Sequence, residues 1–284
     1  MPYSSRIMDV LRYLLIALIL AIVLFPVYWI LITSIKPENQ ITIYPPVFLP
    51  FSFTLEHYIH VIYGYSGLVK FSLFPSYFMN SIIVSSASTV LSILLALFAA
   101  FSFSRYRFRG KDILFLSIII LRACPGIALS IPLYIFFRTL RLDDTLLGLF
   151  IAYTALNTPF ATWLLFGYLD EIPRVIDEAA RIDGASWWSV LWNILVPLSK
   201  PGILTTALLI FIFSWNEFPI AFVVTSSVAS RTATVGIYTF MQEFFIDWGG
   251  MSAAATLMYI PPMILAFIAQ KALVRGLTFG AIKG

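Results

Sequence analysis

The first candidates for function are the few polar side chains that lie within long apolar runs. Arg122 lies about nine residues into one run, and Asn216 and Glu217 interrupt another in the segment 215–219. Ionisable groups inside a bilayer are costly and usually mark a transport pathway or gate. The alternatives are that Arg122 snorkels to the interface, and that Glu217 belongs to a helix-breaking polar patch paired with a neighbouring helix. The sequence leaves both interpretations open.

Patterns typical of catalysis or metal binding are missing from the sequence. His57 and His60 are three residues apart, but no obvious third ligand lies near them, so we predict no metal site. The phosphate-loop pattern G-x-x-x-x-G-K-[ST], the pattern H-E-x-x-H and the elbow G-x-S-x-G do not occur. We therefore predict neither catalytic residues nor a cofactor, and of 14 acidic residues only Glu217 is expected at membrane depth. A transporter with this sequence needs a partner as its energy source.

The composition indicates a membrane protein. Of 284 residues, 60% are hydrophobic and only 11% are charged, against about a quarter charged in soluble domains. The 18 basic residues form no dense stripe, so we expect no nucleic-acid partner. Six runs are long and apolar enough to cross a bilayer as helices. They are residues 14–35, 77–103, 113–137, 145–169, 203–225 and 251–269.

The distribution of basic residues predicts the orientation of these spans. With the N-terminus inside, 12 Lys and Arg residues lie on the inner side and 5 on the outer side. Basic residues concentrate on the cytoplasmic side of membrane proteins, so both termini are expected in the cytoplasm. The loop 170–200 then becomes the largest cytoplasmic segment, and the Pro-rich segment 36–76 becomes an outer cap.

The cytoplasmic loop 170–200 carries signals for a short helix. Pro173 suits the first turn of a helix, and Gly184 suits the left-handed position that ends one. Within that helix, Asp177 and Arg181 are spaced for an ion pair. After Gly184, Ser186 can cap a second helix, whose tryptophans could rest at the membrane interface. Spacing alone also allows an interfacial helix that merely connects two spans.

The run from Glu178 to Ser186, EAARIDGAS, resembles the EAA loop of ATP-binding-cassette (ABC) importer permeases, in particular of their carbohydrate-uptake branch. Other segments are similar to the second permease of maltose-type importers. These are residues 132–134, 144–149, 159–160, 215–218, 231–232 and the tail 275–284. The similarity covers most of the chain and is weakest in the first 75 residues and in 228–250.

The resemblance implies an all-α protein with six transmembrane helices in the type I ABC importer permease fold, forming one domain over residues 1–284. It implies that the loop 170–200 is a coupling loop that docks on a cytoplasmic ATPase. The residues expected in this contact are Glu178, Ala179, Ala180, Asp183, Gly184 and Ala185. The tail is implied to reach the ATPase through Gly280, Ala281 and Lys283.

The implied assembly lies in a prokaryotic inner membrane. It contains a second permease, two copies of an ATP-binding subunit and an extracytoplasmic solute-binding protein, and it imports a carbohydrate. The resemblance implies that the ATP-binding subunits hydrolyse ATP and that this chain is not itself an enzyme. Sugars combine hydroxyl groups with apolar ring faces, which polar and aromatic residues can bind. Arg122, Asn216 and Glu217 are therefore the expected pathway residues.

Two other classes of function remain as alternatives. An ion-coupled secondary transporter or channel subunit would work without ATP and would be expected to carry acidic residues within its spans. The other alternative is a polytopic scaffold or a membrane enzyme. A membrane enzyme would be expected to bring a set of catalytic residues together on one side of the bilayer.

Overall fold

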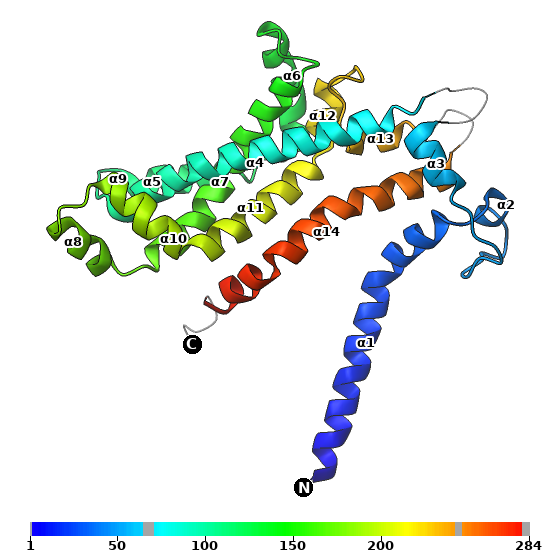
Figure 1. Cartoon of the computed structure of the whole chain (residues 1–284), viewed down its shortest axis with the longest axis horizontal. Helices are drawn as coiled ribbons and strands as arrows, with labels where there is room; N and C mark the ends of the chain where they lie inside the picture. The colour runs from blue at the N-terminus through cyan, green and yellow to red at the C-terminus, as the bar shows by residue number, and fades with distance from the viewer. Residues whose placement is uncertain (1, 65–70, 242–245, 280–284) are drawn as a thin grey trace. The chain divides into compact units, whose positions relative to one another are not determined.

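A computed structural model describes residues 2–64, 71–241 and 246–279, and these residues form helices and loops without a β-strand (Figure 1). This confirms the all-α prediction. The helices are α1 (Pro2–Thr33), α2 (Glu38–Ile41), α3 (Glu56–Tyr63), α4 (Phe74–Arg105), α5 (Lys111–Leu121), α6 (Gly126–Thr139), α7 (Leu146–Asp170), α8 (Arg174–Ile182), α9 (Trp187–Val190), the π-helical segment η1 (Leu191–Leu195), α10 (Val196–Leu198), α11 (Lys200–Trp215), α12 (Pro219–Val224), α13 (Ala233–Tyr238) and α14 (Trp248–Phe279).

Within the described residues, four helices are long and apolar enough to cross a membrane: α1, α4, α7 and α14. Two further pairs of helices meet these criteria together but are bent. The pair α5 and α6 bends by 92°, and the segment Trp187–Leu198 bends by 78° against α11. The number of spans is therefore four, or up to six if each bent pair crosses the membrane once.

Two of the six predicted runs are divided in the structure. The run 113–137 is interrupted between Leu121 and Gly126, where Pro125 has no N–H for helical pairing and disfavours helical geometry in the residue before it. The run 203–225 is interrupted between Trp215 and Pro219, and Pro219 starts α12. Apolar composition alone did not reveal these breaks, because both halves of each run are hydrophobic.

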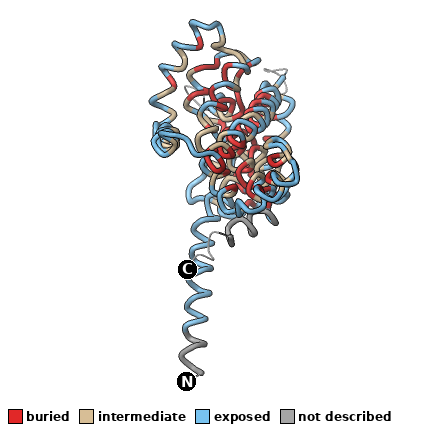
Figure 2. Tube along the Cα trace, turned by 90° about the vertical axis from the view of Figure 1, so that its left-hand side faces the viewer, coloured by how far each residue is buried: buried red, intermediate tan, exposed pale blue. Residues whose placement is uncertain are grey.

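By internal packing the chain separates into two compact units. That residues 1–284 act as one permease domain stays a prediction. The first unit comprises residues 1–75 and 237–259, and the second comprises residues 76–236 and 260–284. In the first unit, α1 exposes its apolar side chains from Met8 to Tyr28, a surface suited to lipid (Figure 2). At its end, Lys36 is buried and donates to the Val47 carbonyl. Burial lowers the pKa of Lys36.

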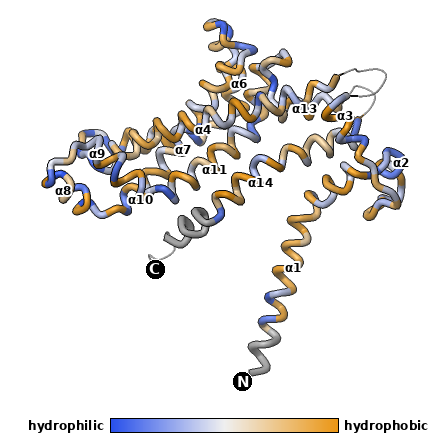
Figure 3. The backbone as a smooth tube through the Cα atoms, in the orientation of Figure 1, coloured by the Kyte–Doolittle hydropathy of each residue, from blue (hydrophilic) through white to orange (hydrophobic). Residues whose placement is uncertain are grey.

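The second unit contains two hydrophobic clusters. One joins α4, α7, α9, η1 and α11, and the other joins α4, α6, α7, α12 and α13. Figure 2 shows buried residues throughout these packed helices, and Figure 3 shows hydrophilic residues gathered around α8. The first cluster is continuous with the base of the loop that carries α8, so this loop is supported by the core of the second unit.

Candidate functional site

The short helix in the loop 170–200, α8, begins and ends where the sequence predicted. Pro173 precedes the first helical residue of α8, and Gly184 follows its end with φ of +86°. Glycine adopts this left-handed conformation without the steric cost that a Cβ imposes. A Cβ built at Gly184 meets no atom within 4 Å, so the position faces open space.

The residues expected to contact the ATPase lie on accessible surface of α8 and the following turn. Glu178, Ala179, Asp183 and Gly184 are exposed, and Ala180 and Ala185 are half-buried. Two large apolar residues of the same helix, Val175 and Ile182, are also exposed, at 71% and 86%. This helix therefore presents small, acidic and apolar groups outward, which is the surface composition that a docking partner can cover.

The other side of α8 is attached to α4 by charge. Asp177 is buried and forms an ion pair with the Nε of Arg105, the last residue of α4. Burial raises the pKa of Asp177, and the guanidinium groups of Arg105 and Arg174 oppose that shift. The predicted Asp177–Arg181 pair is therefore wrong. The guanidinium of Arg181 instead donates to the Ala185 carbonyl at 2.8 Å and lies over the Trp187 ring.

Sequence reasoning missed the role of Arg105, which counted only as one of the basic residues that set the orientation. Its Nη1 donates to the Leu169 carbonyl and its Nη2 to the Ile172 carbonyl, both at 3.1 Å. Arginine can make several such bonds at once because its donors are spread over a rigid planar group. Only its place at the end of an apolar span, together with acidic residues in the helix of the loop, could have suggested this pairing.

The helix α9 is also held against α4, by aromatic contacts. The side chain of Ser186 caps α9 by accepting from the Ser189 amide, as predicted. Trp188 stacks on Phe98 with ring centroids 6.0 Å apart, and Trp187 meets Phe101 edge-on, also at 6.0 Å. The expected position of these tryptophans at the membrane interface stays a prediction; Trp187 is half-buried and Trp188 is 64% exposed.

The three expected pathway residues line one cavity. Arg122, Asn216 and Glu217 come from two chain segments 94 residues apart, and they enclose a volume of about 270 Å³ together with Tyr153, Leu156, Asn157, Ile212 and Phe213. The Arg122 guanidinium lies 5.0 Å from the centre of the Phe213 ring. Charged, amide, hydroxyl and aromatic groups therefore meet in one place, at the breaks that divide two of the predicted spans.

Within this cavity Glu217 has a clear structural task. Its carboxylate accepts from the backbone N–H groups of Ile220 at 2.9 Å and Ala221 at 3.1 Å, which are in the first turn of α12. These amides have no partner within the helix, so the side chain satisfies them. The Glu217 backbone carbonyl also accepts from the Thr234 hydroxyl at 2.9 Å. Glu217 is thus a helix cap that also borders the cavity.

A comparison with family models accounts for most of this architecture. Residues 92–279 match the family described as "Binding-protein-dependent transport system inner membrane component". The chain belongs to this family. The matched region contains the loop 170–200 and the cavity, while α1 and the segment 36–76 precede it.

Several curated relatives match this permease over nearly its whole length. It is 34% identical over 276 residues to the "Sulfoquinovosyl glycerol transport system permease protein SmoH" of Agrobacterium fabrum, covering 96% of this chain and 94% of the relative. It is 36% identical over 277 residues to the "Trehalose/maltose transport system permease protein MalG" of Thermococcus litoralis, covering 96% and 97%.

Solved structures support the same fold. A crystal structure of a bacterial ABC transporter involved in the import of the acidic polysaccharide alginate aligns with a TM-score of 0.77 at 24% identity, covering 94% of this permease and 97% of that chain. An inward-facing structure of the MetNI methionine ABC transporter aligns with a TM-score of 0.60 at 17% identity, covering 72% and 96%. The permease therefore has the type I importer fold that the sequence resemblance implied.

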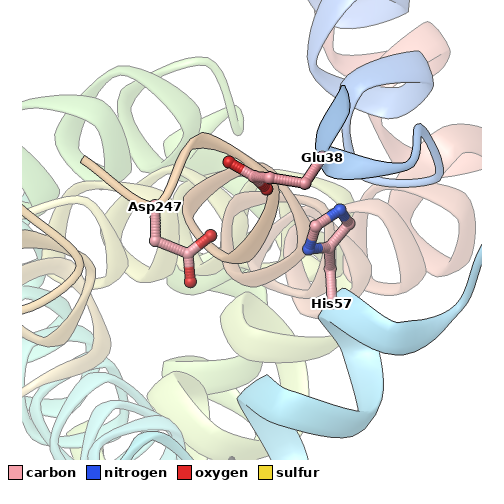
Figure 4. Close-up of side chains that lie close together, drawn as sticks. All are labelled: Glu38, His57 and Asp247. Carbon is pink, nitrogen blue, oxygen red and sulfur yellow. The ribbon is translucent and has the colours of Figure 1, made fainter. Parts of the chain in front are cut away.

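Metal-ligand side chains also meet in the first unit of the permease. Glu38, His57 and Asp247 each place one ligand atom within 4.8 Å of the others (Figure 4). His57 and Asp247 are buried, Glu38 is exposed, and the Nε2 of His57 is hydrogen-bonded to the Lys36 carbonyl at 2.8 Å. The Asp247 carboxylate accepts from the Gly250 amide at 2.7 Å. We therefore interpret the cluster as a polar junction, and the absence of a metal site stays a prediction.

The expected tail contacts Gly280, Ala281 and Lys283 lie outside the described residues, so their role also stays a prediction.

A second polar network involves the loop before α7. The Asp144 carboxylate accepts from the backbone N–H groups of Ser226 and Ser227, each at 2.8 Å, and from the Ser230 hydroxyl. Burial alone would raise the pKa of Asp144, but these hydrogen bonds outweigh burial and hold it well below its usual value. The network joins two segments more than 80 residues apart in the sequence.

Replacing Asp144 with alanine should loosen the segment 225–231. Without its acceptor, protection of the Ser226 and Ser227 amides against hydrogen exchange should fall by roughly tenfold, the equivalent of about 1.4 kcal/mol. In the unaltered permease the pKa of Asp144 is lower in the folded state than in the unfolded state. The hydrogen bonds that Asp144 accepts therefore stabilise the fold at neutral pH, and this stabilisation is lost only as the pH falls below about 4. Asp143→Ala is the matched control, and equal protection in both variants would contradict the assignment.

Proposed function

We propose that this permease is one transmembrane subunit of an ATP-driven carbohydrate importer, and that it receives energy by docking α8 on a cytoplasmic ATPase. The observation that carries the proposal is the two-sided character of α8. One side is tied to the membrane helices through Asp177, while Glu178, Ala179 and Gly184 remain accessible on the exposed surface. Two apolar residues of α8, Val175 and Ile182, are exposed as well, and we expect the ATPase to cover them.

The carbohydrate assignment is supported by two independent points. Relatives that match over more than 90% of their length have names that refer to sulfoquinovosyl glycerol, trehalose and maltose. The cavity at Arg122 and Glu217 combines hydrogen-bonding groups with the aromatic rings of Tyr153 and Phe213. Such a mixture suits an uncharged, hydroxyl-rich solute with apolar ring faces. We therefore assign Arg122, Asn216 and Glu217 to the translocation pathway.

The assembly follows from this function. The permease forms half of the pathway beside a second permease, and two ATP-binding subunits hydrolyse ATP in the cytoplasm. An extracytoplasmic binding protein delivers the solute. Both termini lie in the cytoplasm, because this orientation places most basic residues on the inner side of the membrane. The six spans are then α1, α4, α7, α14, the bent pair of α5 and α6, and the run 203–225, which comprises most of α11 and all of α12.

The proposal can be tested by isolating the assembly through a tag on this permease and identifying the co-purified subunits by mass spectrometry. The assembly is then reconstituted in liposomes with its binding protein. We expect ATP-dependent uptake of radiolabelled trehalose or maltose, and none of methionine. Uptake of methionine alone, or an assembly without an ATP-binding subunit, would refute the proposal.

The same liposomes separate the importer from an ion-coupled transporter. Vanadate traps ABC ATPases, so it should stop uptake, while a protonophore should leave uptake unchanged. Uptake that continues without ATP and collapses with the protonophore would favour the ion-coupled alternative.

A further inference from the structure

We infer that Arg105 and Asp177 are positioning residues whose buried ion pair makes the coupling helix α8 and the inner end of α4 move together. The inference rests on the proposed function, since it concerns how force applied to α8 reaches the membrane helices. It assigns the first step of transmission to α4, which is separated from α8 in sequence by the whole of α5, α6 and α7.

The ion pair is buried and surrounded by further bonds. The side chains of Arg105 and Asp177 are only 2% and 3% exposed. Arg105 uses its remaining donors on the Ser104 hydroxyl, the Leu169 carbonyl at the end of α7 and the Ile172 carbonyl in the turn before α8. One guanidinium therefore links the end of α4, the end of α7 and the first turn of α8.

A second contact reinforces this joint. Arg174, the first residue of α8, donates from its Nη2 to the Ser104 carbonyl at 2.6 Å. The Ser104 hydroxyl donates to the Asp170 carboxylate at 3.2 Å, which again joins α4 to the end of α7. The last two residues of α4 thus provide both attachment points for the start of α8.

The physical character of the joint favours transmission of movement. Removing one partner of a buried ion pair is strongly unfavourable because the other charge is left uncompensated. Apolar contacts are non-directional and can slide, whereas this pair holds α8 at a defined position and orientation. A nine-residue helix is too short to be stable in isolation, so its position depends on such contacts.

The inference is tested in the whole assembly with cysteine probes, after Cys124→Ser removes the single native cysteine. Val175→Cys reports on α8 and Arg107→Cys reports on the chain just beyond α4; both positions are exposed. Each is labelled with a maleimide before and after trapping with MgATP and vanadate. With the ion pair intact, trapping should change the labelling rate at both positions by about fivefold or more.

Asp177→Asn should separate the two responses. The change at Val175→Cys should persist, because the ATPase still engages α8, while the change at Arg107→Cys should be lost. Rates before trapping should resemble those of the unaltered assembly, which a general loss of structure would not allow. Glu171→Gln, which removes an exposed acid from the same loop, is the matched control and should preserve both responses. Asp177→Glu keeps the charge and should restore part of the Arg107→Cys response.

Each remaining outcome has a definite meaning. If both responses survive in Asp177→Asn, the inference is wrong. If Val175→Cys does not respond even with the ion pair intact, the proposed docking fails instead. If Asp177→Asn does not accumulate in the membrane, Arg174→Met decides, because it removes the bond to the Ser104 carbonyl and leaves the Arg105–Asp177 ion pair in place. A weakened Arg107→Cys response then supports the inference, and an unchanged one contradicts it.

Discussion

Gly184→Asp is expected to leave the permease in the membrane and to abolish ATP-dependent uptake. The position has φ of +86°, so any side chain costs about 1–2 kcal/mol of backbone strain, but a Cβ meets no atom within 4 Å. The fold can therefore tolerate the change. In the docked assembly the new carboxylate would be buried without a partner against the ATPase, which costs about 2–5 kcal/mol of binding free energy. The permease should therefore bind the ATPase at least about 30-fold more weakly.

The matched control for this variant is Gly110→Asp. Gly110 also has a positive φ, of +82°, and a Cβ there also meets no atom within 4 Å, but it lies in the turn between α4 and α5. Both variants should reach the membrane in equal amounts, as judged by immunoblotting. Only Gly184→Asp should lose the ATP-binding subunit during purification. Normal uptake by Gly184→Asp would refute docking through α8.

Glu217→Ala should be strongly destabilising. The substitution removes the acceptor for the backbone N–H groups of Ile220 and Ala221, two residues that are fully buried. Each buried donor left without a partner costs about 1–3 kcal/mol, so we expect a total of about 2–6 kcal/mol. The measurement is the thermal unfolding of the purified permease in detergent, followed by tryptophan fluorescence.

Glu217→Gln separates the structural role of this residue from its proposed role in the pathway. The two amides are accepted by different oxygens of Glu217, and glutamine keeps one of these acceptors, so part of the stability should return. If uptake nevertheless falls in the stable glutamine variant, the carboxylate takes part in transport. A glutamine variant with full stability and full uptake would leave Glu217 as a helix cap only, and an alanine variant as stable as the unaltered protein would contradict the capping role.

Features that depend on residues close together in the sequence were predictable from the sequence alone. The boundaries of α8 follow from Pro173 and Gly184, and the cap of α9 follows from Ser186, because such signals act within one or two turns of a helix. The apolar runs indicated a helical membrane protein, because every backbone polar group must be paired in a bilayer and a helix achieves this within one segment. The run EAARIDGAS indicated the family for the same local reason: its residues are contiguous.

Only the tertiary structure decided which distant side chains meet. The spacing of Asp177 and Arg181 suggested a pair within α8, yet Asp177 faces Arg105, 72 residues earlier, because α8 turns that side toward α4. Arg122 and Glu217 were separate candidates until the packing of the helices placed them around one cavity. Local sequence sets where a helix begins and ends, whereas the face that it buries depends on the shape and charge of all its neighbours, and these come together only in the folded chain.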